Sequence, residues 1–434
     1  MVYDIVVQEN KLTGEKYNIE KTKDRKSGIK DADFVICSIE HGDRFKHRWQ
    51  DNKIPHDHGS TEMMAENGGP GGFFHSVRQI PEIVNIAKDV FKANPHAFFI
   101  NYSNPMSRIC LAIKRAVPEL NTIGLCHQIG LLLSDLPFII EDKLQENNLK
   151  NVSPIEKIRL HEECLKNTKI TVGGLNHFAF VLGMNDFKTG EDLMPKFNAR
   201  CMNYYKDKWD HFKYADLTFE IYKRFGWFPY VGDNHICEYL EFGSEYTKYQ
   251  DLQDWIAMME QGKIGVNERF KRYHERLKKG NYPKKGMMIK GESGERGVPI
   301  IEEIVEDKKT YEIAINLPND KFIENLPRDL VIECSARVDK EGVHGIKLGN
   351  ISKPIAAILC IEASVQDVCV DALLNESKDL AKACIAMDVN CGSFKMAEEI
   401  FKEMIKLQKD YLLKQYWVIQ PQQKPSQKLV RQKR

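Results

Sequence analysis

Residues 96–105 read HAFFINYSNP, an apolar run of strand length followed by a polar turn. Similar strand-like runs lie before it, at 33–39 (DFVICSI), and after it, at 122–125 (TIGL). Helical patterns separate the three runs, one over 81–94 and one from the turn to about Val117. The order β-α-β-α-β with short connections predicts parallel strands with right-handed crossovers, which is half of a doubly wound, Rossmann-like sheet.

Polar residues follow the three predicted strands. Ser38 comes after the first, Asn104 after the second and Cys126 after the third. In doubly wound sheets, ligands bind in a crevice beyond the carboxyl ends of the strands. We therefore expect Ser38, Asn104 and Cys126 to line one crevice.

The pattern changes after a fourth apolar run, Ile170-Thr171-Val172. Strand-like and helical stretches then alternate as in a mixed α+β lobe. We therefore predict a partial Rossmann-like domain over 1–165, a second α+β domain over 166–415 and a basic, flexible tail over 416–434.

Composition excludes several classes of protein. The 434 residues include 63 Lys and Arg against 62 Asp and Glu, so no whole-molecule charge favours nucleic acid or an anionic membrane. No run reaches the roughly 18 apolar residues of a transmembrane helix. The 11 cysteines are an odd number without a CxxC pair, and the N-terminus lacks signal-peptide features. We expect a cytoplasmic protein with reduced thiols.

A glycine-rich dinucleotide fingerprint, GxGxxG after a first strand, is not found in the sequence. The dense glycine cluster Gly68-Gly69-Pro70-Gly71-Gly72 follows polar sequence instead of a strand. It can be a flexible turn that enters a helix or a loop that holds a ligand, and the sequence leaves both open.

Three segments carry residues suited to chemistry. Cys126-His127 ends a strand and His177 follows a Gly-Gly turn, so one thiolate and one imidazole could hold a divalent metal with open positions. The alternative is a packed cysteine and a hydrogen-bonded histidine. Asp233 lies in a loop among aromatic residues, where it could be a general base or an Asx-turn residue.

Taken together in chain order, these motifs resemble glycoside hydrolase family 4, the NAD- and manganese-dependent α-glycosidases and 6-phospho-glycosidases. The resemblance spans roughly residues 30 to 415. The motifs that carry it are Asp33-Phe34-Val35-Ile36, Gly69-Pro70-Gly71-Gly72-Phe73, Arg78-Gln79-Ile80-Pro81, Asn101-Tyr102-Ser103-Asn104-Pro105-Met106, Gly124-Leu125-Cys126-His127, Gly174-Leu175-Asn176-His177 and Gly232-Asp233-Asn234-His235.

The resemblance implies a role for each matching residue. Cys126 and His177 would be the protein ligands of Mn²⁺, and Asn104 would contact the substrate and the cofactor. Lys53 stands where the family often has a substrate-contacting arginine. With Ser38 beside NAD, His127 as general acid and Asp233 as base, this completes the expected site.

The implied reaction is a redox-assisted elimination, an exception to two-carboxylate glycoside hydrolysis. NAD⁺ would oxidise C3 of the sugar, Asp233 would remove the C2 proton, and His127 would assist departure of the C1 oxygen. Because a histidine follows the metal cysteine, the resemblance points to unphosphorylated α-glucosides, α-galactosides or α-uronides as substrates. Homodimers or homotetramers are usual in the family.

The chain departs from the family at its N-terminus. Met1 enters after the family's first strand, glycine-rich turn and helix, so we expect NAD to bind poorly and a sheet edge to be unpaired. This leaves a rival interpretation, a catalytically impaired relative that keeps the fold and the metal site. A 2-hydroxy-acid dehydrogenase is a third interpretation, which the metal-type residues do not favour.

Overall fold

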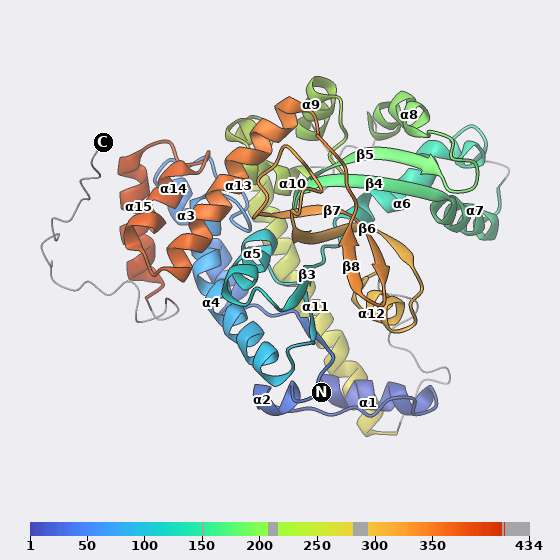
Figure 1. Cartoon of the computed structure of the whole chain (residues 1–434), viewed down its shortest axis with the longest axis horizontal. Helices are drawn as coiled ribbons and strands as arrows, with labels where there is room; N and C mark the ends of the chain where they lie inside the picture. Colours follow the sequence, from blue (N-terminus) through green and yellow to red (C-terminus); the bar gives the residue numbers. More distant parts are fainter. Residues whose placement is uncertain (150–151, 207–215, 281–293, 410–411, 413–434) are drawn as a thin grey trace, which may run out of the picture.

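An eight-stranded mixed sheet runs through the protein (Figure 1). The computed structural model describes residues 1–149, 152–206, 216–280, 294–409 and 412, and the predicted tail at 416–434 lies outside this part. The strand order is β1-β2-β3-β6-β7-β4-β5, and β8 pairs with β7. The strands are β1 (Phe34–Cys37), β2 (Phe98–Asn101), β3 (Asn121–Gly124), β4 (Thr168–Leu175), β5 (Phe178–Asp186), β6 (Thr310–Pro318), β7 (Val331–Asp339) and β8 (Gly342–Gly345).

The three strands predicted from the N-terminal part form the parallel portion of the sheet. β1 pairs with β2 and β2 with β3, both in parallel, so the Rossmann-like β-α-β-α-β prediction is confirmed. From β3 onward the pairs β3–β6, β6–β7 and β7–β4 are antiparallel. β1 forms one end of the described sheet, where the Ile36 side chain is 44% exposed.

Helices surround the sheet in groups, which Figure 1 shows. α13, α14 and α15 lie beside α3 and α4, whereas α6, α7 and α8 lie near β4 and β5. No helix among the described residues is long and apolar enough to cross a bilayer. The α-helices are α1 (Val2–Leu12), α2 (Arg25–Gly28), α3 (Arg44–Asp57), α4 (Gly69–Ala93), α5 (Met106–Ala116), α6 (Ile129–Ile140), α7 (Pro154–Asn167), α8 (Met194–Lys206), α9 (Asp216–Phe225), α10 (Asp233–Ile236), α11 (Tyr249–Lys278), α12 (Gly297–Val305), α13 (Lys353–Leu374), α14 (Lys378–Met387) and α15 (Phe394–Leu407). Short 3-10 turns are η1 (Asp142–Leu144), η3 (Cys237–Tyr239) and η4 (Glu241–Glu245).

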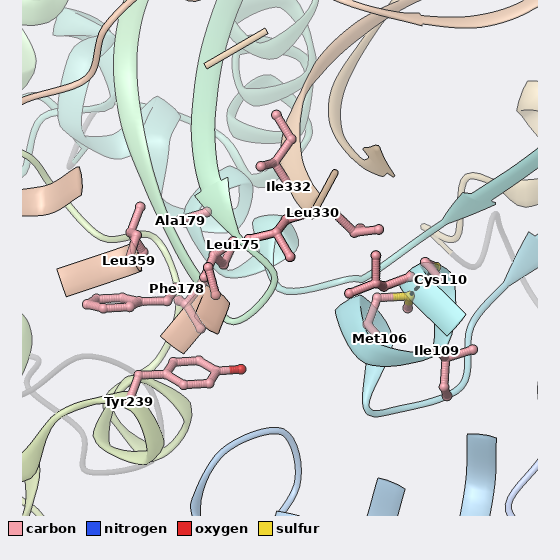
Figure 2. Packing of buried hydrophobic residues seen from close by; sticks show 14 of the residues in the cluster. Met106, Ile109, Cys110, Leu175, Phe178, Ala179, Tyr239, Leu330, Ile332 and Leu359 are labelled. Atoms are coloured by element: carbon pink, nitrogen blue, oxygen red, sulfur yellow. Dashed lines mark hydrogen bonds between the residues drawn. The ribbon is translucent and has the colours of Figure 1, made fainter. Parts of the chain in front are cut away.

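One hydrophobic core joins the N-terminal and C-terminal parts of the chain. Figure 2 shows Met106 and Cys110 of α5 in the same cluster as Leu175 and Phe178 from the β4–β5 hairpin. α5 packs against β3, β6 and β7, so strands from both predicted domains share its apolar face. The domain boundary at residue 165 therefore stays a prediction.

The helix predicted over 81–94 begins much earlier than expected. α4 starts at Gly69 and carries Pro81 in its interior, so the glycine cluster belongs to the helix and is fully buried. Close packing explains the glycines: a Cβ on Gly71 would lie 2.1 Å from the carbonyl oxygen of Asp51. The cluster is thus a rigid, packed helix start and not a flexible turn.

Candidate metal and catalytic site

Cys126 and His177 meet as expected. Sγ of Cys126 lies 3.5 Å from Nε2 of His177. The meeting does not come from parallel strand ends, because β4 runs opposite to β3 through three antiparallel pairings. Instead the cross-strand partners Gly124, Asn316, Glu333 and Gly174 form one row across the sheet, which brings the ends of β3 and β4 together.

A two-residue turn between β4 and β5 presents His177. Leu175 pairs with Phe178, so Asn176 and His177 form the turn, and His177 is buried with φ +62°. A left-handed conformation costs a non-glycine residue roughly 1–2 kcal/mol and persists where surrounding contacts impose it. Gly174 is required just before the turn, because a Cβ there would lie 2.5 Å from the Phe178 carbonyl oxygen.

A buried group of potential metal ligands surrounds His177. One ligand atom each from Glu66, His177, His235 and Glu238 lies within 4.8 Å of every other. Nδ1 of His235 is 3.5 Å from both Oε2 of Glu66 and Oε1 of Glu238. The ring of His235 lies against that of His177, with centroids 4.0 Å apart.

The negative charges of the two carboxylates in this group are stabilised by different partners. Arg48 on α3 lies 2.7 Å from Oε1 of Glu66. Burial raises the pKa of Glu66, but Arg48 and the two histidines outweigh it and hold that pKa well below its usual range. Oε2 of Glu238 accepts hydrogen bonds from the backbone N–H groups of Glu66, Asn67 and Gly68, at 2.6–3.0 Å. The segment directly before α4 therefore binds a carboxylate of the protein itself, so the Gly68 amide of the glycine cluster is not available to an external ligand.

Burial keeps both expected metal ligands neutral. It raises the pKa of the Cys126 thiol to about 12, and it lowers the pKa of His177 well below its usual value, with His235 adding to that shift. A neutral imidazole and a thiol can bind a divalent ion once the thiol loses its proton. A thiolate, an imidazole and nearby carboxylates suit transition metals such as Zn²⁺ or Mn²⁺.

Three other predicted residues follow the ends of β1, β2 and β3. His127 is 75% exposed, and its Nδ1 lies 3.9 Å from Oε1 of Glu295. Oδ1 of Asn104 is buried and has no hydrogen-bond partner within the described chain. Ser38 lines a cavity of about 530 Å³ together with Tyr102 and Arg296.

The carboxylate of Asp233 binds the start of α9. It accepts hydrogen bonds from the backbone N–H groups of Leu217 and Thr218, at 3.0 and 3.1 Å, and from the Thr218 hydroxyl. These amides form the first turn of α9, so the carboxylate caps that helix. This geometry favours a structural role for Asp233, and its role as a base stays a prediction. His235, two positions later, occupies the place at the site.

Lys53 pairs with a carboxylate on its own helix, and its substrate contact stays a prediction. Its Nζ lies 2.7 Å from Oδ1 of Asp57, one turn further along α3. The same helix turns Arg48 toward the ligand group instead.

Sequence reasoning missed Glu66, Asn67 and His235. Glu66 and Asn67 directly precede the glycine cluster, and His235 lies within the Asp233 motif. All three residues therefore lie in or beside segments that the sequence had already indicated. Only the fold shows that they converge on His177.

An exposed histidine beside buried, metal-type donors, at strand ends of a Rossmann-like sheet, is typical of an enzyme. Comparison with protein families specifies which class. A model described as "Family 4 glycosyl hydrolase" matches residues 1–136, and one for the "Family 4 glycosyl hydrolase C-terminal domain" matches residues 172–391. The chain belongs to glycosyl hydrolase family 4, as its motifs predicted.

Relatives with known names agree with this family. An α-glucosidase of Erwinia rhapontici is 30% identical over 91% of this chain and 85% of its own length. An α-galacturonidase of Lachnoclostridium phytofermentans is 25% identical, with 92% and 85% covered. A 6-phospho-α-glucosidase from gut microorganisms, solved in complex with NAD and Mn²⁺, superposes with a TM-score of 0.73 at 20% identity, covering 95% of this chain and 89% of that one.

Proposed function

We propose that this protein is an NAD- and Mn²⁺-dependent glycosidase that hydrolyses unphosphorylated α-glycosides, with Cys126 and His177 as the protein ligands of the metal. The observation that carries the proposal is the 3.5 Å approach of the Cys126 sulfur to Nε2 of His177. Two liganding atoms at that separation can share one ion and leave positions open for sugar oxygens. The Erwinia relative named α-glucosidase supports the substrate class.

The donor set fits a manganese ion. Cys126 and His177 supply the sulfur and nitrogen donors, and the carboxylates of Glu66 and Glu238 make the surroundings favourable for a cation. When bound, the metal and NAD supply Lewis acidity and hydride acceptance at the sugar ring. His127, exposed beside the metal cysteine, would give a proton to the departing C1 oxygen.

For NAD, we propose the strand-end cavity as the site. Ser38 lines it, and the buried, unpartnered Oδ1 of Asn104 is an acceptor available to the cofactor or the sugar.

Charge pairing favours a neutral sugar over a uronic acid. Arg78 is buried against Asp51 and Gln408, at 3.0 and 2.7 Å, and Arg296 is paired with Glu303 and Glu312. Lys53 is paired with Asp57. Each of these three cationic side chains therefore already has a carboxylate partner within the protein. We therefore propose α-glucosides or α-galactosides as the preferred substrates.

Location and assembly complete the proposal. All eleven cysteines are free and nine of them are buried, which suits a reducing, cytoplasmic environment. The position of β1 at the end of the described sheet supports association into a homodimer or homotetramer through its open edge. Light scattering should then give a mass of at least twice 50.2 kDa.

Hydrolysis of a panel of p-nitrophenyl α-glycosides tests the activity. The panel contains the glucoside, the galactoside, the glucuronide and glucose 6-phosphate derivatives, each assayed with Mn²⁺, NAD⁺ and a reductant. We expect turnover of a neutral glycoside that is lost when Mn²⁺ is chelated. Turnover of none of them would support a relative without activity, and preference for the phosphorylated sugar would contradict the substrate assignment.

A further inference from the structure

Asn67 links three parts of the site. Its side-chain amide nitrogen lies 2.7 Å from Nδ1 of His177, and its Oδ1 accepts the backbone N–H of Met106 at 3.1 Å. Met106 begins α5, where the first N–H groups of a helix lack intrahelical partners. Asn67 thus joins the turn that carries His177 to the start of α5.

The hydrogen bond to Met106 determines which end of the amide faces His177. Because Oδ1 accepts from Met106, the NH₂ group must point toward the imidazole. An amide N–H only donates, so Nδ1 of His177 accepts, and Nε2 is the ring nitrogen directed at Cys126. The ring orientation of the metal ligand is therefore set by Asn67.

Glu238 fixes the backbone of Asn67 in turn. Its Oε2 accepts three consecutive backbone N–H groups, from Glu66 to Gly68, and the Glu238 side chain is fully buried. Gly68 packs so closely that a Cβ would lie 2.5 Å from the Glu238 carbonyl oxygen. The loop cannot shift without breaking this clamp, so the position of Asn67 is rigid.

We propose that Asn67, held by Glu238, is the positioning residue that orients His177 for metal binding. The inference rests on the proposed function, since it takes His177 as a metal ligand. A metal-bound histidine usually donates its other ring N–H to an oxygen acceptor. A metal on Nε2 would place the ring proton on Nδ1, so the Asn67 amide would have to turn its carbonyl oxygen to Nδ1 and release the N–H of Met106, which would couple metal binding to the turn that carries Asn104.

Mn²⁺ affinity of three variants tests this positioning role. Free Mn²⁺ is measured by electron paramagnetic resonance during titration of the purified full chain, without substrate or NAD. Asn67→Ala should weaken Mn²⁺ binding about 10- to 100-fold, the usual loss for a partner of a metal-bound histidine. Asn67→Asp should bind Mn²⁺ at least as tightly as the wild type, because a carboxylate accepts from both Met106 and Nδ1 of His177.

A matched control distinguishes the specific effect of Asn67 on His177 from the general effect of removing a buried asparagine. Asn319 is fully buried, and its side chain makes four hydrogen bonds within the 319–327 loop and none to Cys126 or His177. Asn319→Ala removes these four bonds and should leave Mn²⁺ affinity unchanged. Thermal melts verify that each variant folds. Unchanged affinity in Asn67→Ala, or an equal loss in Asn67→Asp, would overturn the inference while leaving the proposed glycosidase intact. Absence of Mn²⁺ binding by the wild type would overturn both the inference and the metal assignment.

Discussion

The sulfur of Cys126 and Nε2 of His177 lie 3.5 Å apart although 51 positions separate the residues in the chain. Cys126 follows β3 and His177 follows β4, two strands of opposite direction that are joined by a row of cross-strand partners through β6 and β7. Such a pair needs the whole sheet to form, so metal binding reports on the completed fold.

Replacing the metal cysteine should abolish tight metal binding. We expect Cys126→Ala to lower Mn²⁺ affinity by more than about 100-fold, beyond the usual loss for an outer partner. Calorimetric titration measures this change. Cys360→Ala is the control, because Cys360 is a partly exposed thiol on α13 and should leave the affinity unchanged. Equal affinities of wild type and Cys126→Ala would show that the sulfur is not a ligand.

The proposed acid role of His127 predicts a dependence on the leaving group. Its ring is exposed at the end of β3, where no buried partner needs it for folding. We expect His127→Ala to slow hydrolysis of alkyl α-glycosides by about 10²- to 10⁴-fold, since they need protonation to leave. Hydrolysis of p-nitrophenyl glycosides should fall far less. An equal reduction for both substrate types would argue against proton donation by His127.

The capping role of Asp233 predicts a loss of stability. Asp233→Ala leaves two first-turn N–H groups of α9 without their acceptor, and should destabilise the protein by about 0.5–2 kcal/mol. Denaturant unfolding measures this. Asp233→Asn keeps one acceptor oxygen and should retain most activity. An Asp233→Asn variant with wild-type stability and no turnover would instead restore the general-base interpretation.

A buried carboxyl on α13 makes stability depend on pH. Burial raises the pKa of Glu362 to about 8 from an ordinary 4.5, despite Arg108 at 3.4 Å. The folded protein therefore binds a proton that the unfolded chain releases, and this stabilisation is complete below pH 4.5 and is lost as pH rises through 8.

Thermal melts at pH 5 and pH 8.5 check the effect of Glu362. We expect the melting temperature of the wild type to be lower at pH 8.5 than at pH 5, and that of Glu362→Gln to decrease less, since glutamine stays neutral. In Glu260→Gln, a change at an exposed residue, the melting temperature should decrease as much as in the wild type. An equal decrease in Glu362→Gln and the wild type would contradict the assignment.

The parallel strands were predictable because their signals are local. The runs at 33–39, 96–100 and 122–125 are apolar, short and bounded by turns, and β1 to β3 fall within or beside them. The start of α4 was not predictable, because glycine and proline usually break helices. Only the close packing against Asp51 explains why glycine stands there. Local composition cannot show such a packing demand.

The site was predictable in part for the same reason. Cys126 and His177 follow apolar strands, which marked them as strand-end residues. Asp233 matched a base position by motif, yet its carboxylate is directed to α9 by contacts that form only in the fold. Glu66 is positioned by its hydrogen bond to Glu238, and His235 by its contact with the ring of His177. Both contacts join residues from different elements of the fold, so local sequence does not show them.

Anomalous diffraction at the manganese edge, from crystals grown with Mn²⁺, tests the central claim most directly. The account predicts one strong peak within bonding distance of both Sγ of Cys126 and a ring nitrogen of His177. A peak held by Glu66 and Glu238 without Cys126, or no peak near His177, would contradict it.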